Sequence, residues 1–171
     1  MHWRLFDRDT LLVGGDTLRG KPYLLAYDAQ DGTFLWKKDG GSSGGITDIQ
    51  LDSQGNLYLA GSASTFNGGD TLFDNLIFQP VNVPSFRKPY TAPYLLKYDP
   101  SGNLLWHQFG SGGARTLSLA INGAEVALSG SHAGLYFSGG ADTLPDPNAT
   151  SLHGNAFIAR FEQQSGRPLG L

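Results

Sequence analysis

The stretch YLLKYDPSGNLLW at residues 94–106 is the strongest indicator of the fold, because its elements occur three times in the chain. Its first six residues return as YLLAYD at 23–28 and as FIARFE at 157–162. Each copy is followed by a glycine-containing turn, and the first two copies then run into Trp36 and Trp106. Gly170 stands at the corresponding position of the third copy. Internal copies of this kind predict a repeat architecture.

Two further blocks accompany each copy. The first reads LLVGG at 11–15, LYLAG at 57–61 and VALSG at 126–130, and strand-like runs precede it at 46–52, 116–121 and, more weakly, 3–7. The second, GGDTL, occurs at 14–18 and 68–72 and, with one inserted residue, at 139–144. Short apolar runs bounded by Gly, Asp, Asn and Ser are typical of strands. We therefore expect four strands per unit, which in the second unit cover 46–52, 56–63, 93–99 and 103–109.

Repeated four-stranded antiparallel units predict an all-β fold of β-propeller blades, which we place at about 2–38, 44–109 and 113–171. Closed propellers have about four to eight blades, so three form part of a larger or oligomeric propeller. The chain also ends within an expected strand, at 169–171. The expected partners are further blades from the same longer chain, from another copy or from a neighbouring protein. Two copies would give six blades around a two-fold axis.

Composition narrows the functional classes. The 171 residues include 24 glycines, no cysteine and 16% charged residues, with a net charge of −3. Glycine disfavours helices, and the negative charge argues against nucleic-acid and anionic-membrane partners. No apolar run approaches the roughly 18 residues of a transmembrane helix. Charged residues near the start, including Arg4 and Asp7, interrupt any signal peptide. The absence of cysteine excludes disulfides, thiolate catalysis and cysteine-ligated zinc.

LLKYDPSGNLLWHQFGS at 95–111 and LDSQGNLYLAGS at 51–62 resemble the SBBP family of bacterial β-propeller repeats. The first unit, LLAYDAQDGTFLWKKDGG at 24–41, is also similar to quinoprotein-type propeller repeats. The chain departs from the pattern at Gly170, near Asp9, where the turn glycine is missing, and in its short first unit. The resemblance implies a non-enzymatic structural or interaction module of a bacterial secreted or cell-surface protein, without catalytic residues or a cofactor.

For several sequence motifs, a structural role is favoured over a functional one. GGSSG at 40–44 matches the G-x-S-x-G elbow, but it and GSGG at 110–113 fit flexible linkers between blades, and Arg115 interrupts any phosphate-binding glycine pattern. Asp28, Asp52 and Asp99 begin turns, where Asx hydrogen bonding is favoured over calcium binding. The four histidines lack zinc-ligand spacing and are expected at the surface or rim; they are His2, His107, His132 and His153.

Two aromatic features remain. Trp36 and Trp106 recur at one repeat position, so we expect them to pack between blades instead of forming a sugar platform. The proline-rich segment 78–93 has no full counterpart in the other units and is the candidate binding loop. Its candidate contact residues are Phe86, Arg87, Lys88 and Tyr90. A carbohydrate- or protein-ligand binder using this loop is therefore the alternative function, and a quinoprotein-type enzyme fragment is a distant third.

Overall fold

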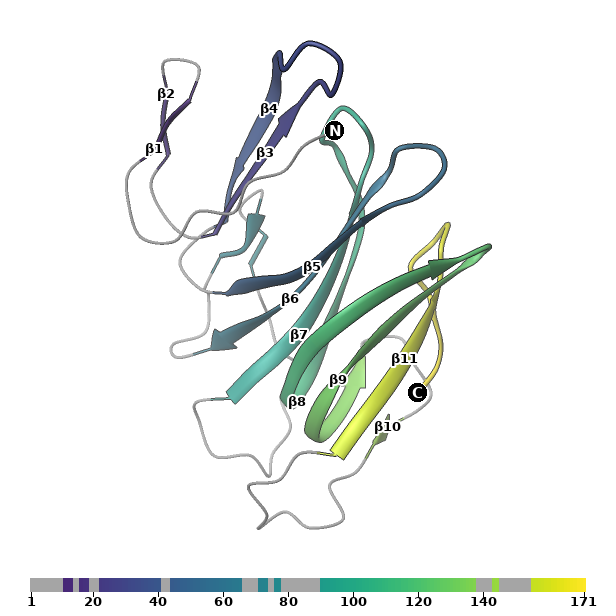
Figure 1. Cartoon of the computed structure of the whole chain (residues 1–171). Coiled ribbons are helices and arrows are strands. Elements are labelled where there is room, and N and C mark those ends of the chain that lie inside the picture. Colours follow the sequence, from purple (N-terminus) through teal and green to yellow (C-terminus); the bar gives the residue numbers. More distant parts are fainter. Residues whose placement is uncertain are drawn as a thin grey trace.

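The chain is an all-β protein, as the sequence predicts (Figure 1). The computed structural model describes residues 11–13, 16–18, 22–40, 44–65, 71–73, 76–77, 90–137, 143–144 and 155–171. In these segments every strand pairing is antiparallel, and none of the named elements is a helix. Two small hairpins come first: β1 (Leu11–Val13) pairs with β2 (Asp16–Leu18), and β3 (Tyr23–Tyr27) pairs with β4 (Phe34–Asp39).

The remaining strands form one sheet with the order β12-β11-β9-β8-β7-β6-β5. Its members are β5 (Gly45–Leu51), β6 (Leu57–Thr65), β7 (Tyr90–Tyr98), β8 (Leu104–Asn122), β9 (Glu125–Phe137), β11 (Asn155–Glu162) and β12 (Pro168–Gly170), with β10 (Thr143–Leu144) attached to β9. The four expected strands of the second unit are thus confirmed, although the third begins earlier, at Tyr90, and the fourth continues as part of β8 to Asn122. The path of this sheet runs from β12 to β5 without closing into a ring.

Strand β8 joins two four-stranded meanders. Up to Phe109 it pairs with β7, and from Gly110 onward it pairs with β9. The second unit therefore consists of β5, β6, β7 and the first part of β8, whereas the third consists of the second part of β8 with β9, β11 and β12. The flexible linker expected at 110–113 is wrong, because these residues continue the strand. A side chain at Gly110 would meet the Pro93 ring on β7, so glycine permits close packing where the strand changes partner.

The first unit differs from the expected four-stranded blade. Within the described residues it consists of two separate hairpins, and the strand expected at 3–7 lies outside them. The Asp-Thr-Leu block explains part of the difference, because it folds back as β2 onto β1. Its counterpart in the third unit, β10, folds back onto β9 in the same way. This block is therefore an additional short strand that the sequence pattern did not reveal.

The two meanders stack face to face, with apolar clusters between successive units. We call the side of a unit that is turned toward the preceding unit its back face, and the opposite side its front face. Tyr58, Ala60 and Leu95 on the front face of the second unit pack with third-unit residues that include Leu128 and Phe161. On the back face of the second unit, a separate cluster contains Leu24 of the first unit. A third cluster, built on Tyr23 and Leu25, lies on the back face of the β3–β4 hairpin.

Close approach inside the second and third units requires glycine at one strand position. A Cβ on Gly61 in β6 would collide with the Gly45 carbonyl oxygen and the Tyr94 ring. Gly130 in β9 is its counterpart, since a Cβ there would collide with the Arg115 carbonyl oxygen and the Phe157 ring. The repeated glycine in LYLAG and VALSG therefore makes room for an aromatic side chain from the next strand.

We predict that Gly61→Ala destabilises the protein by about 1–3 kcal/mol or more, because backbone and a buried ring must move to admit the methyl group. Gly45→Ala is the matched control, since an added Cβ there meets nothing within 4 Å. The free energy of unfolding from urea denaturation checks both variants. Equal stability of the two would contradict the close approach at Gly61.

Candidate functional site

The structure does not bring the expected loop residues together. Phe86, Arg87 and Lys88 lie outside the described residues, so their proposed role stays a prediction. Tyr90 is the first residue of β7, and its side chain is not described. The expected loop boundary at residue 93 is wrong, because residues 90–93 pair with β6. The strand that contains the aromatic and branched residues at 94–98 therefore begins earlier, at Tyr90, and it includes Pro93.

The strongest repeated contact joins a tryptophan of one unit to a turn of the next. The Trp36 Nε1 group donates a hydrogen bond to the Pro100 carbonyl at 3.0 Å. The Trp106 Nε1 group donates to the Gln163 carbonyl at 3.1 Å. Pro100 and Gln163 occupy the same position, directly after the acidic residue that begins the turn between the last two strands of a unit. The predicted packing of both tryptophans between units is confirmed.

Each indole also covers the glycine of the turn that it contacts. Gly102 has φ 85° and Gly166 has φ 72°, in the left-handed region that favours glycine. A Cβ on Gly102 would lie 2.9 Å from the Trp36 ring, and one on Gly166 would lie 2.7 Å from the Trp106 ring. Glycine is thus required twice over at this position, for the turn conformation and for the room that the indole takes.

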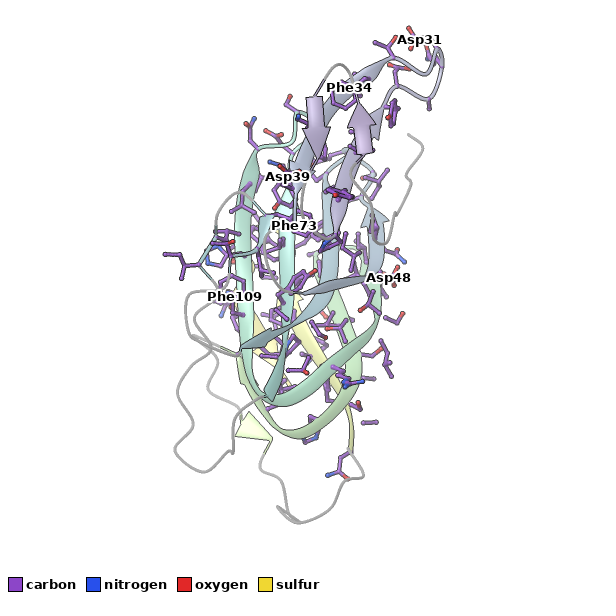
Figure 2. The ribbon with its side chains drawn as sticks, turned by 90° about the vertical axis from the view of Figure 1, so that its left-hand side faces the viewer. Asp31, Phe34, Asp39, Asp48, Phe73 and Phe109 are labelled. Carbon is purple, nitrogen blue, oxygen red and sulfur yellow. The ribbon has the colours of Figure 1, made fainter. Side chains whose placement is uncertain are left out.

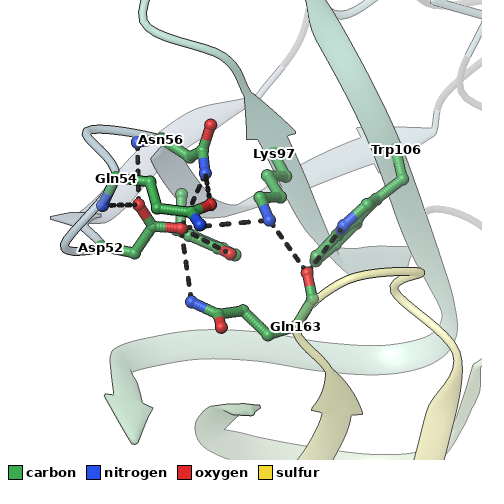
Figure 3. Close-up of polar contacts among 7 residues, drawn as sticks. Asp52, Gln54, Asn56, Lys97, Trp106 and Gln163 are labelled. Carbon is green, nitrogen blue, oxygen red and sulfur yellow. Dashed lines mark hydrogen bonds and ion pairs between the residues drawn. The ribbon is translucent and has the colours of Figure 1, made fainter. Parts of the chain in front are cut away.

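A buried polar network surrounds the second of these contacts (Figure 3). The Lys97 Nζ group donates to the Gln163 carbonyl at 3.0 Å and lies 3.9 Å from the Asp52 carboxylate. The side chains of Lys97 and Asp52 are 8% and 5% exposed. Lys97 also lies over the Tyr58 ring, 5.1 Å from its centroid. The Gln163 carbonyl therefore accepts from both Lys97 and Trp106, and it links the third unit to two strands of the second.

The Asp52 carboxylate organises the other side of this network. Its Oδ1 atom accepts from the backbone N–H groups of Gln54 and Asn56, both at 2.9 Å, as expected for an Asx turn. Its Oδ2 atom accepts from the Asn56 side chain at 2.9 Å and from Gln163 Nε2 at 3.3 Å. Asp52 thus shapes its own turn and also bonds across to the third unit. The sequence predicted the turn but not the bond to residue 163, which is 111 positions away.

The charges in this network are matched to their surroundings. Burial alone would raise the pKa of Asp52, but hydrogen bonds from Asn56, Gln54 and Tyr58 outweigh it, and the pKa lies below its usual value. Burial lowers the pKa of Lys97, while the Asp52 charge acts in the opposite direction. Burial, followed by the Asp52 charge, raises the pKa of the Tyr58 hydroxyl. The tyrosine thus stays neutral at physiological pH, beside a carboxylate that stays ionised.

A shallow pocket of about 300 Å³ lies at the start of β5. Hydroxyl side chains dominate its lining, with one guanidinium; the lining residues are Gly45, Ile46, Thr47, Ser62, Thr91, Arg115 and Thr116. Two of the hydroxyls also join the units, because Thr116 Oγ1 donates to the Gly61 carbonyl and Ser62 Oγ accepts from the Thr116 N–H. Sequence inspection missed this pocket because its residues come from four different strands.

Among the described residues, the other motifs noted in the sequence do not form a metal-binding or reactive cluster. Within the described segments no three metal-binding side chains come together, and no helix is long and apolar enough to cross a membrane. His132 is buried against the Phe157 ring, so its expected surface position is wrong. His2 and His153, and the serines of the 40–44 motif, lie outside the described residues. Asp28 forms the expected Asx turn, since its Oδ1 atom accepts from the Gln30 N–H.

The chain matches no family model, no curated protein and no solved structure.

We predict that Trp106→Ala lowers the free energy of unfolding by about 3 kcal/mol, because a large ring leaves the contact between units. Trp106→Phe should cost only about 1 kcal/mol, since it retains most of the apolar contact and loses chiefly the bond to Gln163. Urea denaturation followed by circular dichroism measures both. An unchanged denaturation midpoint for Trp106→Ala would show that this contact does not contribute to the stability of the fold.

We predict that the stability contributed by Asp52 is lost in acid. Because the folded state lowers the pKa of Asp52, the ionised group stabilises the fold above about pH 4 and ceases to do so as the pH falls through the folded pKa. Asp52→Asn should therefore be less stable than the unaltered protein at pH 7, by about 1.5–3 kcal/mol, with a smaller difference near pH 2. Ser53→Ala in the same turn is the control. A pH-independent difference would contradict this role.

Proposed function

We propose that the chain is a non-enzymatic structural or interaction module, built as a stack of β-propeller-type blades. The observation that carries the proposal is the tryptophan-to-turn contact, which occurs between the first and second units and again between the second and third. A contact repeated with the same donor, acceptor position and glycine specifies how one unit stacks on the next. The best-defined polar groups, at Asp52 and Lys97, are used in that stacking.

The resemblance to SBBP repeats supports the same proposal. Such repeats imply a bacterial secreted or cell-surface protein in which blades act as scaffold. Their partners are further blades from a longer chain, another copy or a neighbouring protein. Buried charges that bond across the units favour a fixed arrangement over a reactive one, because both charges are already satisfied by the protein.

Hydrogen exchange of Trp106→Ala tests this function. If the units are stacked blades held by this contact, amides of β9, β11 and β12 should lose protection while those of β5 to β7 keep most of theirs. Leu105→Ala is the matched control, since its side chain on the same strand is 50% exposed. Uniform loss of protection through the whole sheet would reject a stack of separable units. A stoichiometric absorbance change on adding a quinone cofactor would instead support the enzyme alternative.

The hydroxyl-lined pocket favours carbohydrate binding as the second candidate function. Threonine and serine hydroxyls with one guanidinium can exchange hydrogen bonds with sugar hydroxyls. A glycan array distinguishes this candidate from a pure scaffold. Reproducible binding that Arg115→Ala abolishes and Arg167→Ala retains would support it, because Arg167 lies in a distant turn. Binding to no glycan would leave the structural module as the function.

A further inference from the structure

We propose that the turn of the β3–β4 hairpin, residues 28–32, is a docking socket for a tryptophan-bearing strand of a further repeat unit. The inference rests on the proposed function, because it takes the contact between blades as the recognition chemistry. The occupant is a strand of the Trp36 type, with an indole followed by lysine. The third unit of a second copy does not fit this description, since Gly170 holds the tryptophan position.

The socket has the same length and hydrogen bonding as the turn 162–166 that Trp106 covers, and it differs from the turn 99–102 that Trp36 covers by one additional residue. In all three, the glycine N–H donates to the carbonyl of the residue that begins the turn: Gly32 to Asp28, Gly102 to Asp99 and Gly166 to Glu162, at 3.0, 3.0 and 2.8 Å. Gly32 has φ 74°, close to its counterparts. The Ala29 carbonyl is therefore the counterpart of the acceptors that bond to Trp36 and Trp106 in the other turns.

The first turn differs from the other two in what packs over its glycine. A Cβ on Gly32 would have no described atom within 4 Å, whereas the other two turn glycines touch an indole. Tyr27, just before this turn, is only partly buried, although its counterparts Tyr98 and Phe161 are fully buried. The hairpin end carrying Asp31 and Phe34 projects at one extremity of the molecule (Figure 2). Among the described residues, the first turn thus has the form of the turn 162–166 but no indole over its glycine.

The aromatic pair at the hairpin end supplies the apolar part of the socket. Tyr27 and Phe34 pack edge to face with ring centroids 5.7 Å apart, and both retain exposed surface. In the occupied counterpart, Lys38 lies 4.8 Å from the Tyr98 ring centroid, so the strand that brings Trp36 also brings a cation to this position. Asp28 and Asp31 add negative charge to the first turn, which further favours an indole followed by lysine.

The front face of the third unit cannot serve as the occupant. In the second unit this face uses Tyr58, Leu95 and Trp106 to hold its neighbour. The corresponding positions of the third unit are Ala127, Ile158 and Gly170. Ile158 is 62% exposed, and the counterpart of buried Lys97 is Arg160, an exposed partner of Glu125. The third unit thus lacks the aromatic side chains with which the second unit holds its neighbour, so the two ends of the stack are not complementary.

Nuclear magnetic resonance with a peptide tests the socket directly. The probe is the peptide GTFLWKKDG, which reproduces residues 32–40, and the matched peptide has leucine in place of tryptophan. Adding the tryptophan peptide to the full ¹⁵N-labelled chain should shift the amide signals of Ala29, Gln30 and Gly32. The leucine peptide should bind about tenfold more weakly, because the indole ring and its N–H donor are lost. No shift at this turn, or equal shifts with both peptides, would overturn the proposal.

A socket variant gives an independent check. In Gly32→Asn the new residue tolerates positive φ while its side chain occupies the indole position, so the peptide shifts should disappear. Gly123→Asn is the matched control, because Gly123 also has positive φ and open space around it. Peptide binding that survives Gly32→Asn with unchanged affinity would reject the socket. If hydrogen exchange shows separable units and the peptide fails to bind, the proposal of stacked units is supported and only the proposed socket is rejected.

Discussion

The fold depends on one repeated interaction, in which an indole N–H of one unit bonds to a turn carbonyl of the next while its ring covers the turn glycine. A strand meander exposes two apolar faces, so each unit needs a neighbouring unit packed against it in a fixed position and orientation. The hydrogen bonds from Trp36 to Pro100 and from Trp106 to Gln163 fix the position of each unit relative to the next. The apolar clusters between units then provide most of the burial, because they exclude water without specifying a direction.

Buried charge adds specificity at the contact between the second and third units. Lys97 and Asp52 would be costly to bury alone, but each has partners that replace water. Because the Gln163 carbonyl and side chain bond to groups on two strands and in one turn of the second unit, a shifted third unit would leave several polar groups unsatisfied. The first contact between units combines the indole bond with Lys38, which lies over the Tyr98 ring.

The two ends of the stack have different chemistry, and this difference bears on function. The first turn keeps the geometry of an occupied turn but carries an open glycine and a half-buried Tyr27. The third unit has lost the large aromatic side chains from its front face, with Ala127 and Gly170 at the positions of Tyr58 and Trp106. A stack of this kind is directional. The proposed socket and this altered face lie at opposite ends of the stack.

The sequence by itself determined the all-β class, the second-unit strands, the turn glycines and the packing role of the tryptophans, because strand alternation and turn chemistry are local. It misplaced the linker at 110–113 and His132, and it did not reveal the strands formed by the Asp-Thr-Leu block, since these depend on which distant strand supplies a pairing edge. The bond between Asp52 and residue 163, and the open space around Gly32 among the described residues, become visible only in the folded chain. Such contacts follow from how whole units stack, and no local pattern encodes them.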